Sequence, residues 1–188
     1  NKRSVILNLK KPAAKKALWR LIDTSDVFIH SIRPQKIKKL GFSQEDVCAR
    51  NKRIIYAGIH GYQMGGPYSG EPAYDDVIQG QAGNVDLMAR LVGEPRYMPT
   101  IMADKTCALV AANSVMAALF ERERSNKGQF VEIPMFETMV AYNLTEHLYG
   151  YTFDPPEDQI GYTRVLAPSR RPYKTRDGYI CILVYTDK

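Results

Sequence analysis

The sequence predicts an α/β protein in which a mostly parallel sheet is flanked by helices. Short apolar runs typical of buried strands alternate along the chain with segments whose apolar residues recur at helical spacing. Clusters of Gly and Pro separate these segments, as expected for loops. The 188 residues, of which 45% are hydrophobic, are enough to bury a substantial core.

The chain opens with an expected strand and helix. Residues 4–9 alternate weakly between apolar and polar side chains and predict a strand. Pro12 then occupies a position that the first turn of a helix tolerates. The helix that follows places its apolar side chains on one face, where we expect them in the core: Leu18, Trp19, Leu21 and Ile22.

Two further strands are expected in the first third of the chain, at residues 26–32 and 53–62. The first is a compact apolar run flanked by turn residues, as in a strand that is buried on both faces. Between them, residues 33–41 predict a loop and a short helical turn ended by a glycine. Ser43 with Asp46 resembles a capping box at the start of another short helix.

The alternation continues through residue 150. In order, the expected elements are a Gly/Pro-rich loop (63–72), a helical segment (74–83), a loop (93–99), a long helix from about Lys105 to Arg124, a strand (129–134) and an amphipathic helix (135–150). This order predicts a Rossmann-like, mostly parallel sheet with flanking helices.

The pattern weakens after Gly150. Residues 154–172 resemble a linker that leads to a final strand pair. We therefore expect residues 1–150 to form part of a large α/β domain and residues 151–188 to form a linker and the start of a smaller domain. The chain starts at Asn1 and both begins and ends in strand-like sequence, so we expect an internal fragment of a longer protein.

Positive charge is concentrated at the front of the chain. Residues 1–53 hold 14 Lys or Arg against 4 Asp or Glu, whereas the remaining residues hold 12 against 16. A basic region of this kind attracts polyanions such as nucleic acid or a phosphorylated cofactor, and it also occurs on ordinary solvated helices. Charge alone does not choose among these partners.

Several classes of site are disfavoured. The cysteines (Cys48, Cys107 and Cys181) and the histidines (His30, His60 and His147) are scattered without the spacing of a disulfide framework or a metal site. We interpret the cysteines as buried thiols in a reducing cytoplasm, and we expect no metal. No run approaches the roughly 18 apolar residues of a membrane helix. The motifs GxxxxGK[ST], GxSxG and GxGxxG are absent.

One acid, Asp104, occurs where an apolar approach changes into the long Ala-rich helix. Asp is a favoured N-cap residue, although Cys107 stands where a capping box needs Glu or Gln. A carboxylate at a helix start also lies in the positive end of the helix dipole, which favours its ionised form. The residues alone leave a cap and a catalytic carboxylate open.

Five segments together resemble class III CoA-transferases of the CaiB/BaiF type, which include formyl-CoA and carnitine CoA-transferases. The segments are "NKRSVILNLKKP", "SIRPQKIKKLGF", "IHGYQMGGPYSGEPAYDDVIQGQAG", "MADKTCALVAANSVMAALFERERSNKGQFVEIPMFE" and "PYKTRDGYICI". Each is weak alone, and their order and spacing make the match specific. The resemblance implies a CoA-binding α/β domain and an interlocked homodimer. From the residues themselves we expect a cytoplasmic location and neither a nucleic-acid nor a membrane partner.

The resemblance implies that Asp104 is the catalytic nucleophile. A carboxylate attacks the thioester of an acyl-CoA, and the resulting mixed anhydride exchanges with CoA thiolate to give an aspartyl-CoA thioester. A carboxylic acid acceptor then reverses the sequence. An ionised Asp attacks without first losing a proton, so no neighbouring His is required.

The resemblance also implies a set of CoA-contacting residues at strand ends and loops, where α/β sheets bind ligands. Ser31, Ile32 and Gln35 depart from the Asn, Phe and Gly of the family, and His60 replaces a Lys or a Ser-like residue. The implied CoA contacts are Leu7, Asn8, Leu9, Lys10, Ser31, Ile32, Arg33, Lys39, Ile59, His60, Gly61 and Tyr62. Lys15, Lys16 and Lys38 are interpreted as solvated surface charges.

Three alternatives remain. α-Methylacyl-CoA racemases share the Asp but pair it with a His, where this chain has Tyr74, whose usual pKa of about 10 does not suit proton exchange near neutral pH. Asp75 and Asp76 are interpreted as helix-start acids. A nucleic-acid-binding module lacks a recognisable motif. A fragment without the family's glycine-rich loop would be inactive.

Overall fold

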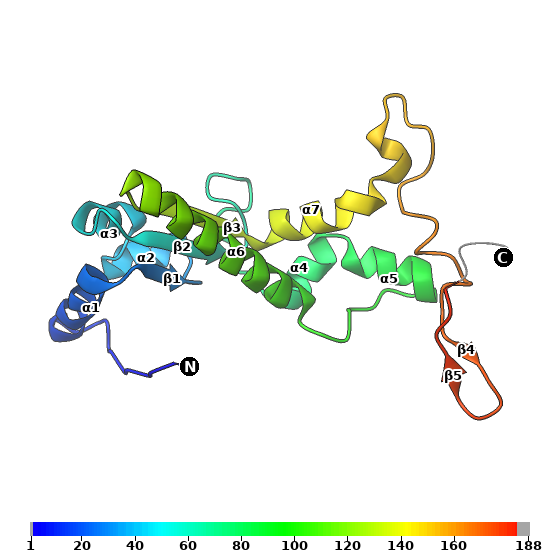
Figure 1. Ribbon diagram of the computed structural model, residues 1–188, viewed down its shortest axis with the longest axis horizontal. Helices are drawn as coiled ribbons and strands as arrows, with labels where there is room; N and C mark the ends of the chain where they lie inside the picture. Colours follow the sequence, from blue (N-terminus) through cyan, green and yellow to red (C-terminus); the bar gives the residue numbers. More distant parts are fainter. Residues whose placement is uncertain (1, 184–188) are drawn as a thin grey trace.

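The computed structural model describes residues 2–183 and contains a parallel sheet of three strands, β1 (Val27–His30), β2 (Ile55–His60) and β3 (Gln129–Pro134) (Figure 1). The strand order is β1-β2-β3, with Val27 opposite Ile55 and Ile55 opposite Gln129. Helices flank this sheet, so the predicted α/β class is confirmed.

Seven α-helices and a second, two-stranded sheet complete the described part of the chain. The helices are α1 (Pro12–Thr24), α2 (Pro34–Leu40), α3 (Gln44–Arg50), α4 (Asp75–Gln81), α5 (Asn84–Val92), α6 (Met102–Ser125) and α7 (Met135–His147), followed by a short 3₁₀ helix, Tyr149–Thr152. The antiparallel hairpin of β4 (Tyr173–Lys174) and β5 (Tyr179–Ile180) lies at the far end of the long axis from α1 (Figure 1). The predicted division near residue 150 stays a prediction, and residues 184–188 of the predicted second domain lie outside the described residues.

Local signals in the sequence explain several helix boundaries. The Ser43 hydroxyl accepts a hydrogen bond from the backbone N–H of Asp46 at 3.2 Å, which confirms the predicted cap of α3. Gly41 ends α2 in the left-handed conformation, with φ of 83°, where a residue with a Cβ is strained. Asp75 and Asp76 both lie in the first turn of α4, as predicted.

Two expectations about secondary structure are wrong. Residues 2–8 form no strand. In the described structure β1 pairs only with β2, so no strand lies beside residues 2–8, and Val5 and Ile6 are exposed. Helix α5 was missed, although "VDLMARLV" has helical spacing of its apolar residues. No element was expected at residues 84–92, between the expected helical segment and the expected loop.

Two expectations about burial are also wrong. Ile22 is buried as predicted, but Leu21 is 49% exposed and does not belong to the hydrophobic core that α1 packs on. Cys107 is buried and Cys48 is half-buried, whereas Cys181 is exposed near the end of the described chain. All three cysteines are free thiols.

Successive side chains of β2 point to opposite faces of the sheet. Helices cover both faces, so β2 is buried on both. Tyr56 packs with Ile22 of α1, Ile37 of α2, Val47 of α3 and Phe42 of the loop between α2 and α3. Ala57 packs into a second cluster formed with residues of α4, α6 and α7. The apolar run at residues 55–60 therefore produces a helix–sheet–helix sandwich around the central strand.

Helix α6 packs on the sheet through small side chains. Its buried apolar residues are Ala103, Cys107, Ala111 and Ala118. The larger residues Leu109, Met116 and Phe120 are 69%, 59% and 62% exposed. Small side chains let the α6 backbone lie close to β2 and β3, which fixes the position of both helix ends.

Helix α6 is apolar on its exposed side as well as on its buried side. Within the described residues it is the one helix that is long and apolar enough to cross a membrane, with a mean hydropathy of 1.2 over 18 residues. The sequence has no uninterrupted run of roughly 18 apolar residues and therefore did not single out this helix. One face of α6 packs against β2, β3, α4 and α7, and 22% of this apolar stretch is buried.

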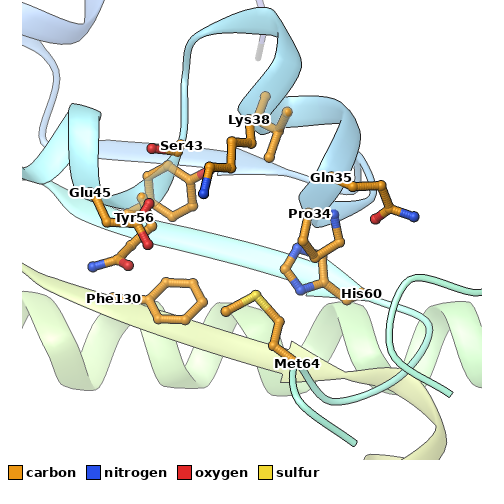
Figure 2. A pocket seen from close by; sticks show the side chains of 11 residues that line it. Pro34, Gln35, Lys38, Ser43, Glu45, Tyr56, His60, Met64 and Phe130 are labelled. Carbon is orange, nitrogen blue, oxygen red and sulfur yellow. The ribbon is translucent and has the colours of Figure 1, made fainter. Parts of the chain in front are cut away.

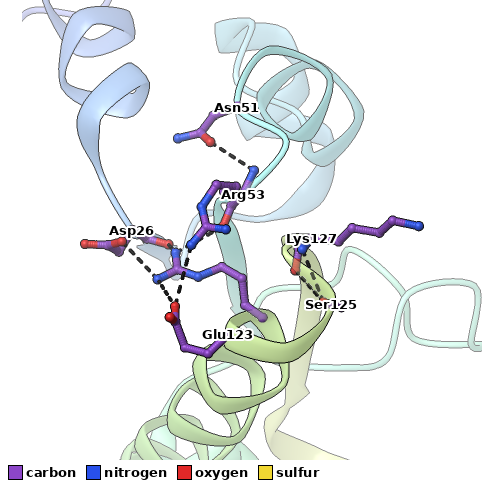
Figure 3. A network of polar contacts seen from close by, with 7 residues as sticks. Asp26, Asn51, Arg53, Glu123, Ser125 and Lys127 are labelled. Atoms are coloured by element: carbon purple, nitrogen blue, oxygen red, sulfur yellow. Dashed lines mark hydrogen bonds and ion pairs between the residues drawn. The ribbon is translucent and has the colours of Figure 1, made fainter.

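Arg122 connects the last turns of α6 to the start of the sheet. Figure 3 shows its partners Asp26 and Arg53 beside Glu123 of α6. The Arg122 guanidinium is 3.0 Å from Oδ1 of Asp26 and donates to the backbone carbonyl of Arg53 at 3.1 Å. Asp26 and Arg53 precede β1 and β2. One buried side chain therefore ties the C-terminal end of α6 to the amino ends of two strands.

We expect Arg122→Met to lower the free energy of unfolding by about 1–3 kcal/mol, because the side chain keeps its apolar stem and loses every donor. Arg124→Met is the control, since Arg124 is exposed and stacks only on the exposed ring of Phe120. That variant should change stability by less than about 1 kcal/mol. Urea denaturation measures both, and equal stability of the two variants would contradict the proposed role of Arg122.

Candidate active site

A pocket of about 330 Å³ opens at the carboxyl ends of the three parallel strands, the usual position of ligand sites in α/β sheets. Its lining comes from the residues that end or follow β1, β2 and β3 and from the starts of α4 and α6. The lining residues are Ser31, Arg33, Ile59, His60, Gly61, Glu71, Ala73, Tyr74, Asp75, Asp104 and Met135.

Asp104 is the third residue of α6 and is exposed to the pocket. The N-cap position belongs to Ile101, so the interpretation of Asp104 as an N-cap is wrong. Within residues 2–183, its carboxylate accepts no hydrogen bond and is open to a ligand. Partial burial raises the pKa of Asp104 above its ordinary value, and the nearby charge of Asp75 raises it further.

Asp75 holds the start of α6 in place. Its side chain is buried, and its Oδ2 atom accepts a hydrogen bond from the backbone N–H of Asp104 at 2.9 Å. Its Oδ1 atom accepts from Nε2 of Gln79, which is fully buried. Oε1 of Gln79 accepts from the N–H of Met98 at 2.9 Å, so Asp75 and Gln79 together fix the approach to Asp104.

His60 presents an unpartnered nitrogen in this part of the molecule. Its Nδ1 atom lies 3.4 Å from Oε1 of Glu132, and since a carboxylate only accepts, the proton is assigned to Nδ1. The Nε2 atom then carries a lone pair, and it is buried without a hydrogen-bond partner among the described residues. Burial lowers the pKa of His60, so the ring is neutral at pH 7.

His30 orders the loop that carries Ser31 and Arg33 into the pocket. The N–H of Ile32 donates to Nδ1 of His30 at 3.0 Å, and Nε2 of His30 lies 2.8 Å from the hydroxyl of Tyr56. The Tyr56 hydroxyl in turn donates to the carbonyl of Phe42 at 3.0 Å. These partners place the His30 proton on Nε2.

Comparison with known proteins identifies the family. The family model of CoA-transferase family III matches residues 1–188. The chain belongs to CoA-transferase family III. A probable fatty acyl-CoA transferase of Mycobacterium tuberculosis is 32% identical over 100% of this chain and 50% of its own length. A succinyl-CoA:glutarate CoA-transferase of Mus musculus is 30% identical over 97% of this chain and 42% of its own.

A solved structure supports the same family. A CaiB/BaiF family protein from Brucella suis aligns with a TM-score of 0.81 and 26% identity, and the match covers 95% of this chain and 47% of that one. This chain therefore spans about half the length of the family III proteins that it matches.

The structure brings together only some of the residues that the resemblance to family III implied. Ser31, Arg33, Ile59, His60 and Gly61 line one pocket with Asp104. Elsewhere, Leu7, Asn8, Leu9 and Lys10 lie in the segment before α1, Ile32 and Lys39 have side chains outside the pocket lining, and Tyr62 is buried and donates to Oε1 of Gln81 at 2.6 Å. The sequence missed Asp75 and Gln79 as site residues.

A smaller cavity of about 170 Å³ shares His60 with the pocket that contains Asp104 (Figure 2). Pro34 and Lys38 of α2 border one side, and Tyr56, Phe130 and Met64 border the other. Its lining is mainly apolar. Within residues 2–183, no group of three or more His, Cys, Asp or Glu side chains is arranged to hold a metal ion.

Protonation of His30 is expected to destabilise the fold in acid. Burial, followed by the effect of His60, lowers the pKa of His30 from 6.5 to about 4. The folded state thus binds this proton more weakly than the unfolded chain. The stability contributed by neutral His30 is complete above pH 6.5 and is lost as the pH falls towards 4.

His30→Asn tests this linkage, because Asn keeps an acceptor for the N–H of Ile32 and does not titrate in this range. We expect the loss of unfolding free energy between pH 7 and pH 4 to be about 2 kcal/mol smaller in His30→Asn than in the unsubstituted protein. Chemical denaturation at a series of pH values measures it. Parallel pH profiles for the two proteins would refute the assignment.

Proposed function

We propose that the full-length protein transfers coenzyme A from an acyl-CoA thioester to a carboxylic acid, with Asp104 as the nucleophile. The observation that carries this proposal is the open Asp104 carboxylate in one pocket with Ser31, Arg33 and His60, at the carboxyl ends of the parallel strands. Membership in CoA-transferase family III supports the reaction class.

The chemistry begins with the ionised Asp104 carboxylate. One of its oxygens forms a bond to the acyl carbon, the C–S bond breaks, and CoA leaves as the thiolate. The thiolate attacks Cγ of Asp104, the C–O bond breaks, and the donor acid leaves as a carboxylate. A second carboxylic acid then repeats these steps in reverse, and this sequence needs no proton transfer to or from Asp104.

Several pocket residues suit a CoA thioester. Arg33 offers a permanent positive charge to phosphate or carboxylate groups. His60 lines the same pocket and is neutral, so it adds no charge to the site. Gly61 lies so close to Ala73 that a Cβ would come within 2.4 Å of the Ala73 Cβ, so a larger residue would disturb this strand end.

The remaining implied contacts are proposals that rest on the resemblance to the family. They are Leu7, Asn8, Leu9, Lys10, Ile32, Lys39 and Tyr62, which the described structure does not bring to the pocket. Cytoplasmic location, a homodimer, and the absence of nucleic-acid and membrane partners likewise stay predictions.

Short dicarboxylic acids are the substrate class that we propose to test first. The mouse relative is named for succinyl-CoA and glutarate, both of which carry a free carboxylate beside the reacting group. Arg33 supplies a cationic partner for such a carboxylate in the pocket.

α-Proton exchange is the second candidate, since His60 shares the pocket with Asp104 while Tyr74 occupies the position of the racemase His. The buried, neutral His60 and the family III relatives favour CoA transfer. Exchange of the substrate α-proton in deuterium oxide without CoA transfer would favour racemisation instead.

We expect Asp104→Ala to lower the CoA-transfer rate by at least about a thousandfold, because the variant cannot form the covalent intermediate. Borohydride reduction or hydroxylamine treatment after incubation with acyl-CoA should modify Asp104, as mapped by mass spectrometry. Asp76→Ala is the control, since Asp76 is exposed in the first turn of α4 and does not line the pocket. Modification of another residue, or an active Asp104→Ala variant, would disprove the nucleophile.

We expect Arg33→Ala to raise KM for acyl-CoA or for the acceptor by about tenfold with a smaller effect on kcat, because a charge-assisted hydrogen bond is lost. Lys16→Ala, which removes an exposed charge on α1, should leave KM unchanged. Steady-state kinetics with each substrate varied measures both variants. An unaltered KM for both substrates in Arg33→Ala would remove Arg33 from the proposed site.

A further inference from the structure

The hydrogen bonds of Asp75 require it to be ionised. The N–H of Asp104 donates to its Oδ2 atom, and Nε2 of Gln79 donates to its Oδ1 atom. The Gln79 amide cannot turn over, since its Oε1 atom already accepts from the N–H of Met98. A protonated Asp75 would present a donor to one of these donors, so the geometry fits only the carboxylate.

The fixed charge of Asp75 lies in the same pocket lining as the free carboxylate of Asp104. Asp75 is 8% exposed, so water screens its charge poorly. Two ionised carboxylates in one partly dehydrated pocket repel each other. The raised pKa of Asp104 has the direction expected from this neighbour.

We propose that Asp75 is a positioning residue that also drives Asp104 towards its covalent intermediates, an inference that rests on the proposed CoA transfer. When an Asp104 oxygen bonds to the acyl carbon and the C–S bond breaks, the negative charge moves from Asp104 to the CoA sulfur. When that sulfur bonds to Cγ and the C–O bond breaks, the charge leaves with the donor carboxylate. In both adducts Asp104 is uncharged, so its repulsion with Asp75 is relieved.

Asp76 provides a matched comparison. It follows Asp75 in the first turn of α4, but it is exposed, does not line the pocket, and its side chain makes no hydrogen bond among residues 2–183. Replacing either acid by Asn removes one charge from the same helical turn. Only Asp75→Asn removes the charge that is held against the backbone of Asp104.

The test measures how much of Asp104 is converted to the CoA thioester in the full-length protein. Unsubstituted protein, Asp75→Asn and Asp76→Asn are incubated with succinyl-CoA, quenched and analysed by mass spectrometry. We expect the ratio of adduct to free Asp104 to fall about tenfold or more in Asp75→Asn and to stay within about twofold in Asp76→Asn. Equal ratios in all three folded proteins would overturn the inference.

Asp75→Glu separates charge from fit. Asn also turns an N–H donor towards one of the two donors that Asp75 accepts from, so the melting temperature of each variant is measured beside its adduct ratio. If Asp75 only supported the structure, the loss of adduct would follow the loss of thermal stability in both variants. If its charge matters, Asp75→Glu should form more adduct than Asp75→Asn. Should Asp75→Asn lack a cooperative thermal transition, Asp75→Glu decides alone: a ratio within about threefold of the unsubstituted protein supports the inference, and a larger loss overturns it. Absence of any Asp104 adduct in the unsubstituted protein would instead refute the proposed function.

Discussion

The close packing of α6 on the sheet is the constraint on which the other features depend. A face of small side chains, including Ala103, Cys107 and Ala111, lets the helix lie against β2 and β3. Arg122 then fastens its C-terminal end to the amino ends of the strands, and Asp75 fastens its N-terminal end at their carboxyl ends. The helix is held at both ends, so the first-turn carboxylate has a defined place.

This arrangement sets the electrostatics of the pocket. The positive end of the α6 dipole favours the ionised form of Asp104, whereas burial and Asp75 oppose it. The two histidines near the strand ends are neutral, because burial lowers the pKa of both. Arg33 is the one Lys or Arg in the described pocket lining, so it is the natural partner for an anionic ligand group.

Features that depend on local pattern were predictable from the sequence. The strand at residues 129–134 and the Ser43 cap were expected where they occur, and Asp104 was expected at a helix start. Each depends on neighbours within a few residues. The resemblance to a family then added a chemical role for Asp104 that its position alone left open.

Features that depend on long-range contacts were not predictable. Asp75 looked like a helix-start acid, and its second partner, the N–H of Asp104, lies 29 residues away. Which face of α6 is buried depends on how closely the sheet approaches, so the burial of Ala103 and the exposure of Leu109 and Phe120 do not follow from the apolar character of these residues. Residues 4–9 have a strand pattern without a strand to pair with in the described structure.

The central claim is that Asp104 meets the acyl carbon of a CoA thioester in this pocket. A crystal structure of the full-length protein with a non-cleavable acyl-CoA analogue tests it most directly. The account predicts the carbon that replaces the thioester carbonyl within about 3.5 Å of an Asp104 oxygen, with Arg33 contacting an anionic group of the ligand. An acyl end that lies elsewhere, such as in the smaller cavity beside Phe130, would contradict it.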